Sequence, residues 1–327
     1  MKLTKLRISV AVALAGLVGS ANAGSYAFQA IPMQPGESIS PNAIAASGAV
    51  TGSLSIPGVG AKSFLYKDSI LGVLADGPGF GLNSQGTVAG GFGAGYVFED
   101  GIETPIPGAA VAWDVNEAGT VVGEANSGGA FIYKDGIVEA FTIDGRDQAF
   151  AIDINNAGAV VGTAHMVNGS ERLAFVRHVD GTIDTIPSPN GGISQGAAIN
   201  DAGQVLVIVQ GDGNTSTFQF WENGVLTDTG VPWNTVLVAQ TIQIQMNNLG
   251  QFVTSDGLYS EGVFTPAADL LPPEYVGEGT DGIFRMSHKV TGINDAGQIV
   301  GAMLEIDLSV FSFKQVGFVL TPSTLCN

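Results

Sequence analysis

One short phrase recurs along this chain, and its repetition limits the folds that the sequence can adopt. The phrase begins with an apolar residue, which is followed by a residue that is usually Asn. Two variable residues, a Gly and, shortly after it, an apolar pair complete the phrase. Clear copies lie at 115–123, 154–162 and 293–301, where the last reads Ile-Asn-Asp-Ala-Gly-Gln-Ile-Val-Gly. Self-similarity at a period of roughly 20–50 residues is the signature of a repeat architecture. The chain is therefore predicted to be one array of similar units.

Seven copies of the phrase divide the chain into seven units. Aligned on the Asn position, they fall at Ala45, which is a degenerate copy, and at Asn83, Asn116, Asn155, Asn200, Asn247 and Asn294. Neighbouring copies are separated by 33 to 47 residues. That length suits a four-stranded sheet and is too short for an independent domain.

The strand signals inside each unit are regular. An apolar stretch ends at the Asn, and Asn-x-x-Gly then turns the chain into a Val- and Ile-rich strand such as 119–123. Asn can accept a local backbone hydrogen bond in such a turn, and Gly tolerates the left-handed conformation. A third strand carries a small residue and an aromatic one, as in Ala130-Phe131, and an Asp-Gly or Asn-Gly turn leads to a fourth, such as 137–141. These dipeptides are strong hairpin signals, so each unit is predicted to be an antiparallel meander.

Seven four-stranded meanders favour an all-β fold, a seven-bladed β-propeller in which radial repetition leaves only short sheet edges. The seventh unit stops after its third strand, at 316–320, while an orphan strand at 26–31 precedes the first repeat. The orphan strand is expected to supply the missing fourth strand and so close the ring. The alternative is an open β-solenoid, which needs dedicated caps at both ends.

The N-terminal residues have the features of a secretory signal. A basic start with Lys2, Lys5 and Arg7 precedes a short apolar core, and Ala21-Asn22-Ala23 is a small-x-small cleavage site. The predicted organisation is a signal peptide at 1–23, a single repeat domain at 24–322 and a tail at 323–327. No later apolar run has the ~20 residues that a membrane helix needs. We expect a bacterial protein exported to the periplasm or the medium, whose single cysteine, Cys326, lies in the tail.

Charge and residue spacing bear on partners and cofactors. The formal net charge is −18, which disfavours nucleic acid because phosphate contacts require Lys and Arg. The three histidines are far apart and have no Cys partner, so no metal site is predicted. Asp114 and Asp153 begin turns that faintly resemble calcium loops, but the further ligands of such loops are missing. Calcium is therefore unsupported, no cofactor is predicted, and these residues are expected to form turns.

The repeat units resemble the HAF family of bacterial extracellular repeats, a class named for a His-Ala-Phe strand. The resemblance covers nearly all of 24–322 through the Ile-Asn-x-x-Gly-x-Val-Val-Gly and Ala-Phe-x-Tyr-x-Asp-Gly phrases. The His of that strand is replaced by Gly129 before Ala130-Phe131 and by Leu173 before Ala174-Phe175. A role for the His therefore does not carry over. The resemblance implies export and a repeat fold, and it implies no catalytic signature.

Candidate binding residues come from the loops after the second and fourth strands, which vary most in length and composition. Binding residues concentrate on variable loops held by a rigid scaffold. The richest segment is the long connection 266–290, and the loop at 232–234 lies near it in ring order. Aromatic side chains interleaved with polar ones suit a sugar ring or a peptide. The candidate ligand-binding residues are Trp233, Tyr275, Phe284, Arg285 and His288.

Three functions remain open at this point. The favoured one is an exported, non-catalytic module that binds a glycan or a protein through the variable loops, and no catalytic residue is assigned. The first alternative is a secreted polysaccharide hydrolase or lyase, which predicts closely paired, buried carboxyls with shifted pKa values in a central cleft. The second is a structural component. Against the binding interpretation, Tyr275 and Phe284 could merely pack the long connection onto the ring.

Overall fold

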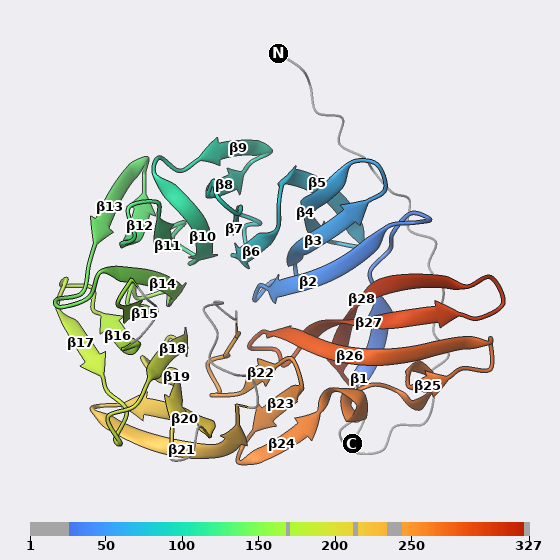
Figure 1. The fold of residues 1–327 in the computed structure, drawn as a ribbon. Coiled ribbons are helices and arrows are strands. Elements are labelled where there is room, and N and C mark those ends of the chain that lie inside the picture. The colour runs from blue at the N-terminus through green and yellow to red at the C-terminus, as the bar shows by residue number, and fades with distance from the viewer. Residues whose placement is uncertain (1–25, 168–170, 212–214, 234–243, 324–327) are drawn as a thin grey trace.

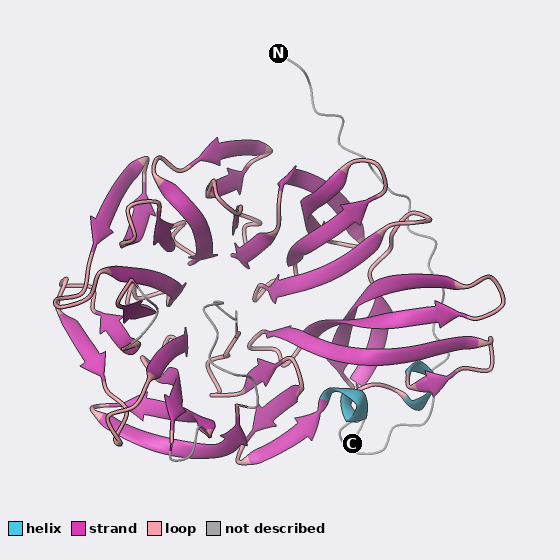
Figure 2. Cartoon of the chain, viewed as in Figure 1, coloured by secondary structure: helices cyan, strands magenta, loops and turns pink. Residues whose placement is uncertain are grey.

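Seven antiparallel sheets surround a central axis in the computed structural model, which describes residues 26–167, 171–211, 215–233 and 244–323 (Figure 1). Strands make up most of these residues, and the helical segments are two short 3-10 turns (Figure 2). The prediction of an all-β, seven-bladed propeller is confirmed. The solenoid alternative is wrong, because the first and last strands of the described chain pair with each other.

Each of the first three blades is a four-stranded sheet whose order in space is its order in sequence. Blade one contains β2 (Ser38–Ile44), β3 (Val50–Ile56), β4 (Gly60–Lys67) and β5 (Ile70–Asp76). Blade two contains β6 (Gly79–Leu82), β7 (Val88–Gly90), β8 (Tyr96–Glu99) and β9 (Ile102–Pro105). Blade three contains β10 (Ala109–Val115), β11 (Val121–Ala125), β12 (Ala130–Lys134) and β13 (Ile137–Phe141).

The next three blades continue the pattern, with one irregular member. Blade four contains β14 (Gln148–Ile154), β15 (Val160–His165), β16 (Leu173–Arg177) and β17 (Ile183–Ile186). Blade five contains β18 (Ser194–Ile199), β19 (Val205–Gln210), β20 (Ser216–Glu222) and β21 (Val225–Pro232). Blade six has three described strands, β22 (Phe252–Thr254), β23 (Gly257–Ser260) and β24 (Val263–Pro266), and Met246 forms a single bridge with Phe252.

Blade seven closes the ring with strands from both ends of the described chain. Its order is β1 (Tyr26–Ala30), β28 (Ser312–Pro322), β27 (Ile299–Asp307), β26 (Ile283–Ile293) and the two-residue β25 (Gly277–Glu278). All five residues of β1 pair with β28, as the orphan strand was expected to do. The strands of this blade reach farther from the ring centre than those of the other blades (Figure 1).

The long connection 266–290 is partly regular structure rather than a loop. It contains η2 (Ala267–Leu270), η3 (Pro273–Tyr275) and β25, and β26 begins at Ile283. The long hairpin that β26 forms with β27 sets this early start, because their pairing begins with Ile283 opposite Asp307. Phe284, Arg285 and His288 therefore lie on a strand.

A recurring irregularity of the inner strands explains the Gly that follows the apolar pair. In blade four the pairing of β14 with β15 shifts by one residue between Ala151 and Asp153, which brings a backbone carbonyl close to β15. A Cβ on Gly162 would lie 2.2 Å from the Phe150 oxygen and 2.5 Å from the Phe175 ring. The equivalent glycines, with a carbonyl equally close, are Gly52, Gly90, Gly123 and Gly301.

The core lies between consecutive blades. The third-strand aromatic residue of the repeat is buried completely in several blades, as with Phe64, Phe131, Phe175 and Phe318. These rings and the Val and Ile residues of the second strands form the clusters that join neighbouring sheets. The repeated phrase is therefore a packing unit, since each copy fills the space between its own sheet and the next.

The described residues contain no helix that is long and apolar enough to cross a membrane. The predicted signal peptide at 1–23 lies outside the described residues, as do Cys326 and most of the tail.

Candidate functional site

A ring of asparagine side chains surrounds the central axis. The side-chain amide of each repeat Asn donates to the backbone carbonyl of the corresponding residue in the next blade, at 3.0–3.5 Å. The last of these bonds runs from Asn294 to Ala45 and crosses the closure between blades seven and one. Blade one has Ala45 in place of Asn, so its own link to blade two is missing. Asn Oδ1 meanwhile accepts backbone N–H groups of its own turn, for example from Ala118 and Thr120 in the case of Asn116.

The residues that follow each Asn form a second polar ring at the mouth of the channel. Five backbone N–H groups donate to a side-chain oxygen of the next blade at 2.7–3.1 Å. The members are Ser84, Glu117, Asn156, Asp201, Asn248 and Asp295. Acidic and amide side chains alternate in most of this ring, so Asn248 Nδ2 donates to both Asp201 and Asp295. The carboxylates are thus held by hydrogen bonds between blades.

A pair of carboxyls lies deeper in the channel, two residues before the Asn of blades three and four. Asp114 Oδ2 accepts the Ile154 N–H at 3.2 Å, and Asp153 Oδ2 accepts the Ile199 N–H at 2.7 Å. Both side chains line a cavity of about 150 Å³. The sequence placed these two residues in turns, but the ring directs them to the channel and links each to the next blade.

The environment of this pair raises both pKa values. Burial raises the pKa of the Asp114 carboxyl well above its ordinary range, and the charge and hydrogen bond of Asp153 raise it further. Burial also raises the pKa of Asp153. Asp114 and Asp153 are each partly exposed to the channel, and the rest of each residue is covered by protein. Two neighbouring carboxyls in such a site cannot both ionise without cost. Asp114 therefore keeps its proton at pH values above the ordinary carboxyl pKa.

Two glycines and a glutamine complete this layer of the channel. Gln245 Oε1 accepts the Ile44 N–H at 3.0 Å, which links blade six to blade one. A Cβ on Gly292 would lie 2.4 Å from that oxygen, so the bond exists because blade seven has no side chain there. Gly81 leaves similar room beside Asp114, whose Oδ1 would lie 2.7 Å from a Cβ at position 81. The layer therefore serves to connect blades.

A groove between blades four and five is a second candidate site. It has about 900 Å³ of accessible space, six times that of the channel cavity. Trp221 of β20 and Asp184 of β17 line it, together with Pro187 and Pro189. The turn 222–224, which carries Glu222 and Asn223, forms its rim. The groove thus combines an indole face, carboxylates and an amide on one concave surface.

The same position one blade earlier is closed by an ion pair. By strand register, Trp221 and Asp184 are equivalent to Arg177 of blade four and Glu139 of blade three. Arg177 binds Glu139 at 2.6 Å, and its guanidinium lies 5.3 Å from the centre of the Phe141 ring. In the groove, Asp184 pairs instead with His178 of its own blade at 2.9 Å. Replacement of an Arg by a Trp at this position therefore leaves the space between blades four and five open.

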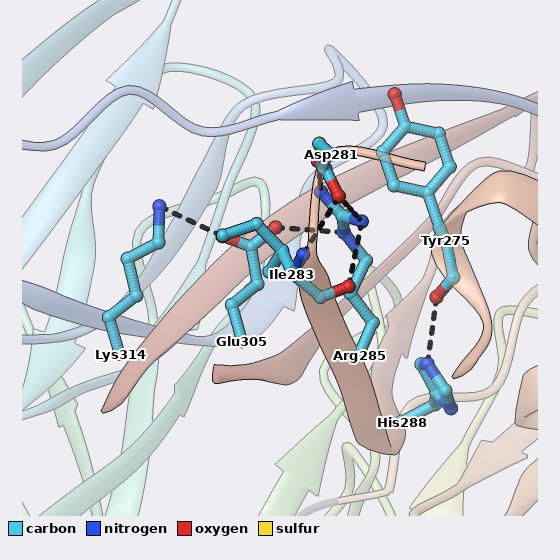
Figure 3. Close-up of polar contacts among 7 residues, drawn as sticks. All are labelled: Tyr275, Asp281, Ile283, Arg285, His288, Glu305 and Lys314. Atoms are coloured by element: carbon cyan, nitrogen blue, oxygen red, sulfur yellow. Dashed lines mark hydrogen bonds and ion pairs between the residues drawn. The ribbon is translucent and has the colours of Figure 1, made fainter. Parts of the chain in front are cut away.

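The sequence-based candidates in blade seven form a polar cluster on β26 and the connection before it (Figure 3). Arg285 is buried and binds Asp281 at 2.7 Å and Glu305 at 3.0 Å. Lys314 binds the other oxygen of Glu305 at 2.8 Å. The hydrogen bonds from Arg285 lower the pKa of Asp281 to about 2. The donors of Arg285 are thus occupied by the protein itself.

Tyr275 and His288 fasten this connection to blade seven. The Tyr275 ring stacks on Phe28 of β1 with the centroids 3.7 Å apart, and Arg285 lies 5.7 Å from its centre. His288 Nε2 is 2.9 Å from the Tyr275 carbonyl oxygen, and burial lowers the pKa of this imidazole (Figure 3). These contacts agree with the packing interpretation of Tyr275 and tie the connection to the strand that closes the ring.

The other two candidates lie apart from this cluster. Phe284 directly precedes Arg285 on β26, so the two side chains point to opposite faces of the sheet. Phe284 is 37% exposed. Trp233 is half-buried in blade five, where its ring meets that of Phe218 at 88°. The structure therefore does not gather the five candidates into one site.

The groove residues escaped sequence reasoning because they belong to different repeats. Only the packing of blade four against blade five brings Asp184 of one unit and Trp221 of the next onto one groove lining. The groove rim is formed partly by short turns such as 222–224, whereas the sequence argument favoured the variable loops. One signal was available: position 221 holds Trp where the equivalent residues are Tyr133, Arg177 and Tyr259.

Among the described residues, no group of three or more His, Cys, Asp or Glu side chains is arranged to hold a metal ion. No protein-family model and no curated protein sequence matches the chain.

Several solved structures are similar to this chain at low sequence identity. A gluconolactonase from Xanthomonas campestris matches with 13% identity and a TM-score of 0.42, covering 97% of this chain and 95% of its own. A fucose-specific lectin from Aleuria aurantia matches with 13% identity and a TM-score of 0.36, covering 61% of this chain and 80% of its own. AofleA from Arthrobotrys oligospora has 8% identity and a TM-score of 0.36, over 89% of this chain and 86% of its own. Similarity this low carries no argument about binding or catalysis.

Proposed function

We propose that this chain is an exported propeller that binds a glycan in the groove between blades four and five. The observation that carries the proposal is the half-buried indole of Trp221, which lines about 900 Å³ of space together with Asp184, Glu222 and Asn223. The apolar face of a sugar ring stacks on an aromatic side chain, while its hydroxyls bond to carboxylates and amides. In the described part of the chain, no ion pair joins blades four and five across this groove, whereas Arg177 and Glu139 join blades three and four at the equivalent position.

Binding can be tested with a panel of neutral and charged oligosaccharides, using isothermal titration calorimetry. We expect saturable binding that Trp221→Ala weakens about tenfold, since a stacking contact of roughly 1.4 kcal/mol corresponds to that factor. The matched control is Tyr133→Ala, which removes the aromatic residue at the equivalent position of blade three. Melting curves of both variants establish that they are folded. Equal affinity of the two variants, or no binding by the native chain, refutes the proposal.

Export and family membership are part of the proposal. The basic start, the apolar core and the Ala21-Asn22-Ala23 site support a cleaved signal peptide, and the repeated phrases support a relation to the HAF repeats. The mass and N-terminal sequence of protein recovered from the periplasm and the medium of an expressing bacterium test export. Export predicts a chain that begins at Gly24. An intact N-terminus in the cytoplasm contradicts it.

The alternative, a secreted polysaccharide hydrolase or lyase, has one observation in its favour. Asp114 and Asp153 are a paired, proton-sharing set of carboxyls in the central channel, which is what that alternative predicts. We rank it second because both carboxyls accept backbone N–H groups of the next blade and the cavity is only about 150 Å³. Release of reducing ends or unsaturated products from a polysaccharide panel, lost in Asp153→Asn, would favour the enzyme.

A further inference from the structure

We infer that the groove between blades four and five selects glycans that carry positive charge, namely oligosaccharides of amino sugars with free amines. The inference rests on the proposed function and names its ligand class. It follows from the charges that line the groove, from the contacts that these charges make, and from the aromatic surface between them.

The groove offers two carboxylates and no permanent positive charge. Asp184, Glu222 and His178 are lining residues, and among the residues that the structure describes the lining contains neither Lys nor Arg. Arg177, which is close in sequence, is bound to Glu139 of blade three and stacked over Phe141. A uronic acid or sulfated sugar would bring a further negative charge against these two carboxylates, and the described lining has no Lys or Arg to receive it. Like charges placed together oppose binding, so anionic glycans are disfavoured.

The two carboxylates are open to a ligand. The Glu222 side chain makes no hydrogen bond or ion pair with any residue in the described part of the chain, and it is exposed. Asp184 is bonded to His178 alone among the described residues, through Oδ2, and 58% of its side chain is exposed. Its Oδ1 is therefore unused. An ammonium group supplies three donors, which matches carboxylate oxygens that only accept.

Trp221 adds an attraction that is specific for cations near an apolar ring face. An ammonium over an indole is drawn to the negative face of the ring, and Trp is the best side chain for this contact. The same indole can stack on the carbon face of the sugar that carries the amine. The whole chain, with a net charge of −18, further attracts a polycationic glycan over longer distances.

The test compares three oligomers of equal length: glucosamine, N-acetylglucosamine and galacturonic acid. Affinities are measured by calorimetry below the pKa of the glucosamine amine, at low and at high salt. We expect the glucosamine oligomer to bind at least tenfold more tightly than the acetylated one, because acetylation removes the charge-assisted hydrogen bonds of the ammonium group. We expect no saturable binding of the galacturonate oligomer, and salt should weaken only the glucosamine oligomer.

Two charge-removing variants locate the effect. Asp184→Asn and Glu222→Gln should each reduce the preference for glucosamine at least threefold while leaving the affinity for the acetylated oligomer within twofold. Trp221→Ala should weaken both oligomers. The matched control is Glu99→Gln, which removes the same charge at the register-equivalent position of blade two and should leave the preference unchanged.

The outcomes separate the inference from the proposed function. If the acetylated or anionic oligomer binds as tightly as glucosamine and Trp221→Ala abolishes binding, the groove binds glycans but the charge selection is refuted. If Glu99→Gln reduces the preference as much as Glu222→Gln, net charge rather than the groove is responsible, and the inference also fails. If no oligosaccharide binds the native chain, the proposed function fails with it.

Discussion

Single residues of the repeated phrase act both within and between blades. Asn116 accepts backbone N–H groups of its own turn through Oδ1, and it donates from Nδ2 to the Asn155 carbonyl of the next blade at 3.1 Å. The sequence predicted the first role from the turn pattern. The second depends on the ring, because only radial packing places one turn against the next. A small buried amide thus combines turn formation with assembly of the propeller.

The carboxyl pair of the channel should make the stability of the fold depend on pH. The folded pKa of Asp114 is raised, so its carboxyl binds more protons in the folded than in the unfolded state above pH ~4. Its stabilising contribution is fully present below the unfolded pKa and is lost as pH rises through the folded pKa. Asp114→Asn keeps the shape and cannot ionise. We expect the variant to melt at increasingly higher temperature than the native chain as pH rises from 4 to neutrality.

The control for this prediction is Asp135→Asn, which removes one carboxylate from an exposed turn of the neighbouring hairpin. Thermal melts of both variants and the native chain in a pH series give the comparison. Because Asp135 is exposed, its melting curve should follow that of the native chain at every pH. Parallel behaviour of Asp114→Asn and the native chain would contradict the account of the channel pair.

The glycine in the second strand of a blade has no room for a side chain. In β15, Gly162 faces the carbonyl that the register shift of β14 brings toward it, with the Phe175 ring on the other side. An added methyl meets backbone and a fully buried ring, neither of which can move freely. We expect Gly162→Ala to destabilise the protein by about 1–3 kcal/mol through overpacking, as measured by thermal or denaturant unfolding.

Gly72 offers a matched control within a strand. It lies in β5, where an added Cβ would meet only the Leu65 oxygen, at 3.7 Å, which is an ordinary contact. Gly72→Ala should therefore change stability by less than about 0.5 kcal/mol. An equal loss in both variants would mean that strand propensity, rather than close approach, sets the cost at position 162.

The whole molecule depends on one pairing between residues far apart in sequence. β1 joins β28, and Phe28 of β1 stacks on Tyr275 and lies 5.5 Å from Phe318. Because Phe28 is half-buried, its truncation should cost less than the ~3–5 kcal/mol of a fully buried Phe. We expect Phe28→Ala to cost about 2 kcal/mol and to expose the C-terminal strand to limited proteolysis before the inner blades are cut.

A second Phe of blade seven tests whether this effect belongs to ring closure. Phe311 is 80% exposed in the turn between β27 and β28. Phe311→Ala removes the same side chain from the same blade without touching β1, so its melting temperature and cleavage pattern should match those of the native chain. Early cleavage in both variants, or in neither, would refute the role of Phe28 as a fastening of the ring.

The sequence predicted the fold better than the site, for a physical reason. Turn chemistry, strand alternation and repeat spacing are local, and they were sufficient to predict seven meanders and closure by the first strand. A binding surface combines residues of different units, and its candidates were inferred from loop variability. Tyr275, Arg285 and His288 are consequently engaged in contacts that hold β1, η3 and β26 together.

By itself the sequence determined the unit of this protein: the Asn turn, the glycine after the apolar pair, the aromatic third strand and the number of repeats. Tertiary structure decided what lies between units. It directed Asp114 and Asp153 into one channel, where burial raises their pKa values, and it set Trp221 and Asp184 on the lining of one open groove. Such pairs have no fixed spacing in sequence, because the ring brings them together through strand register and radial packing.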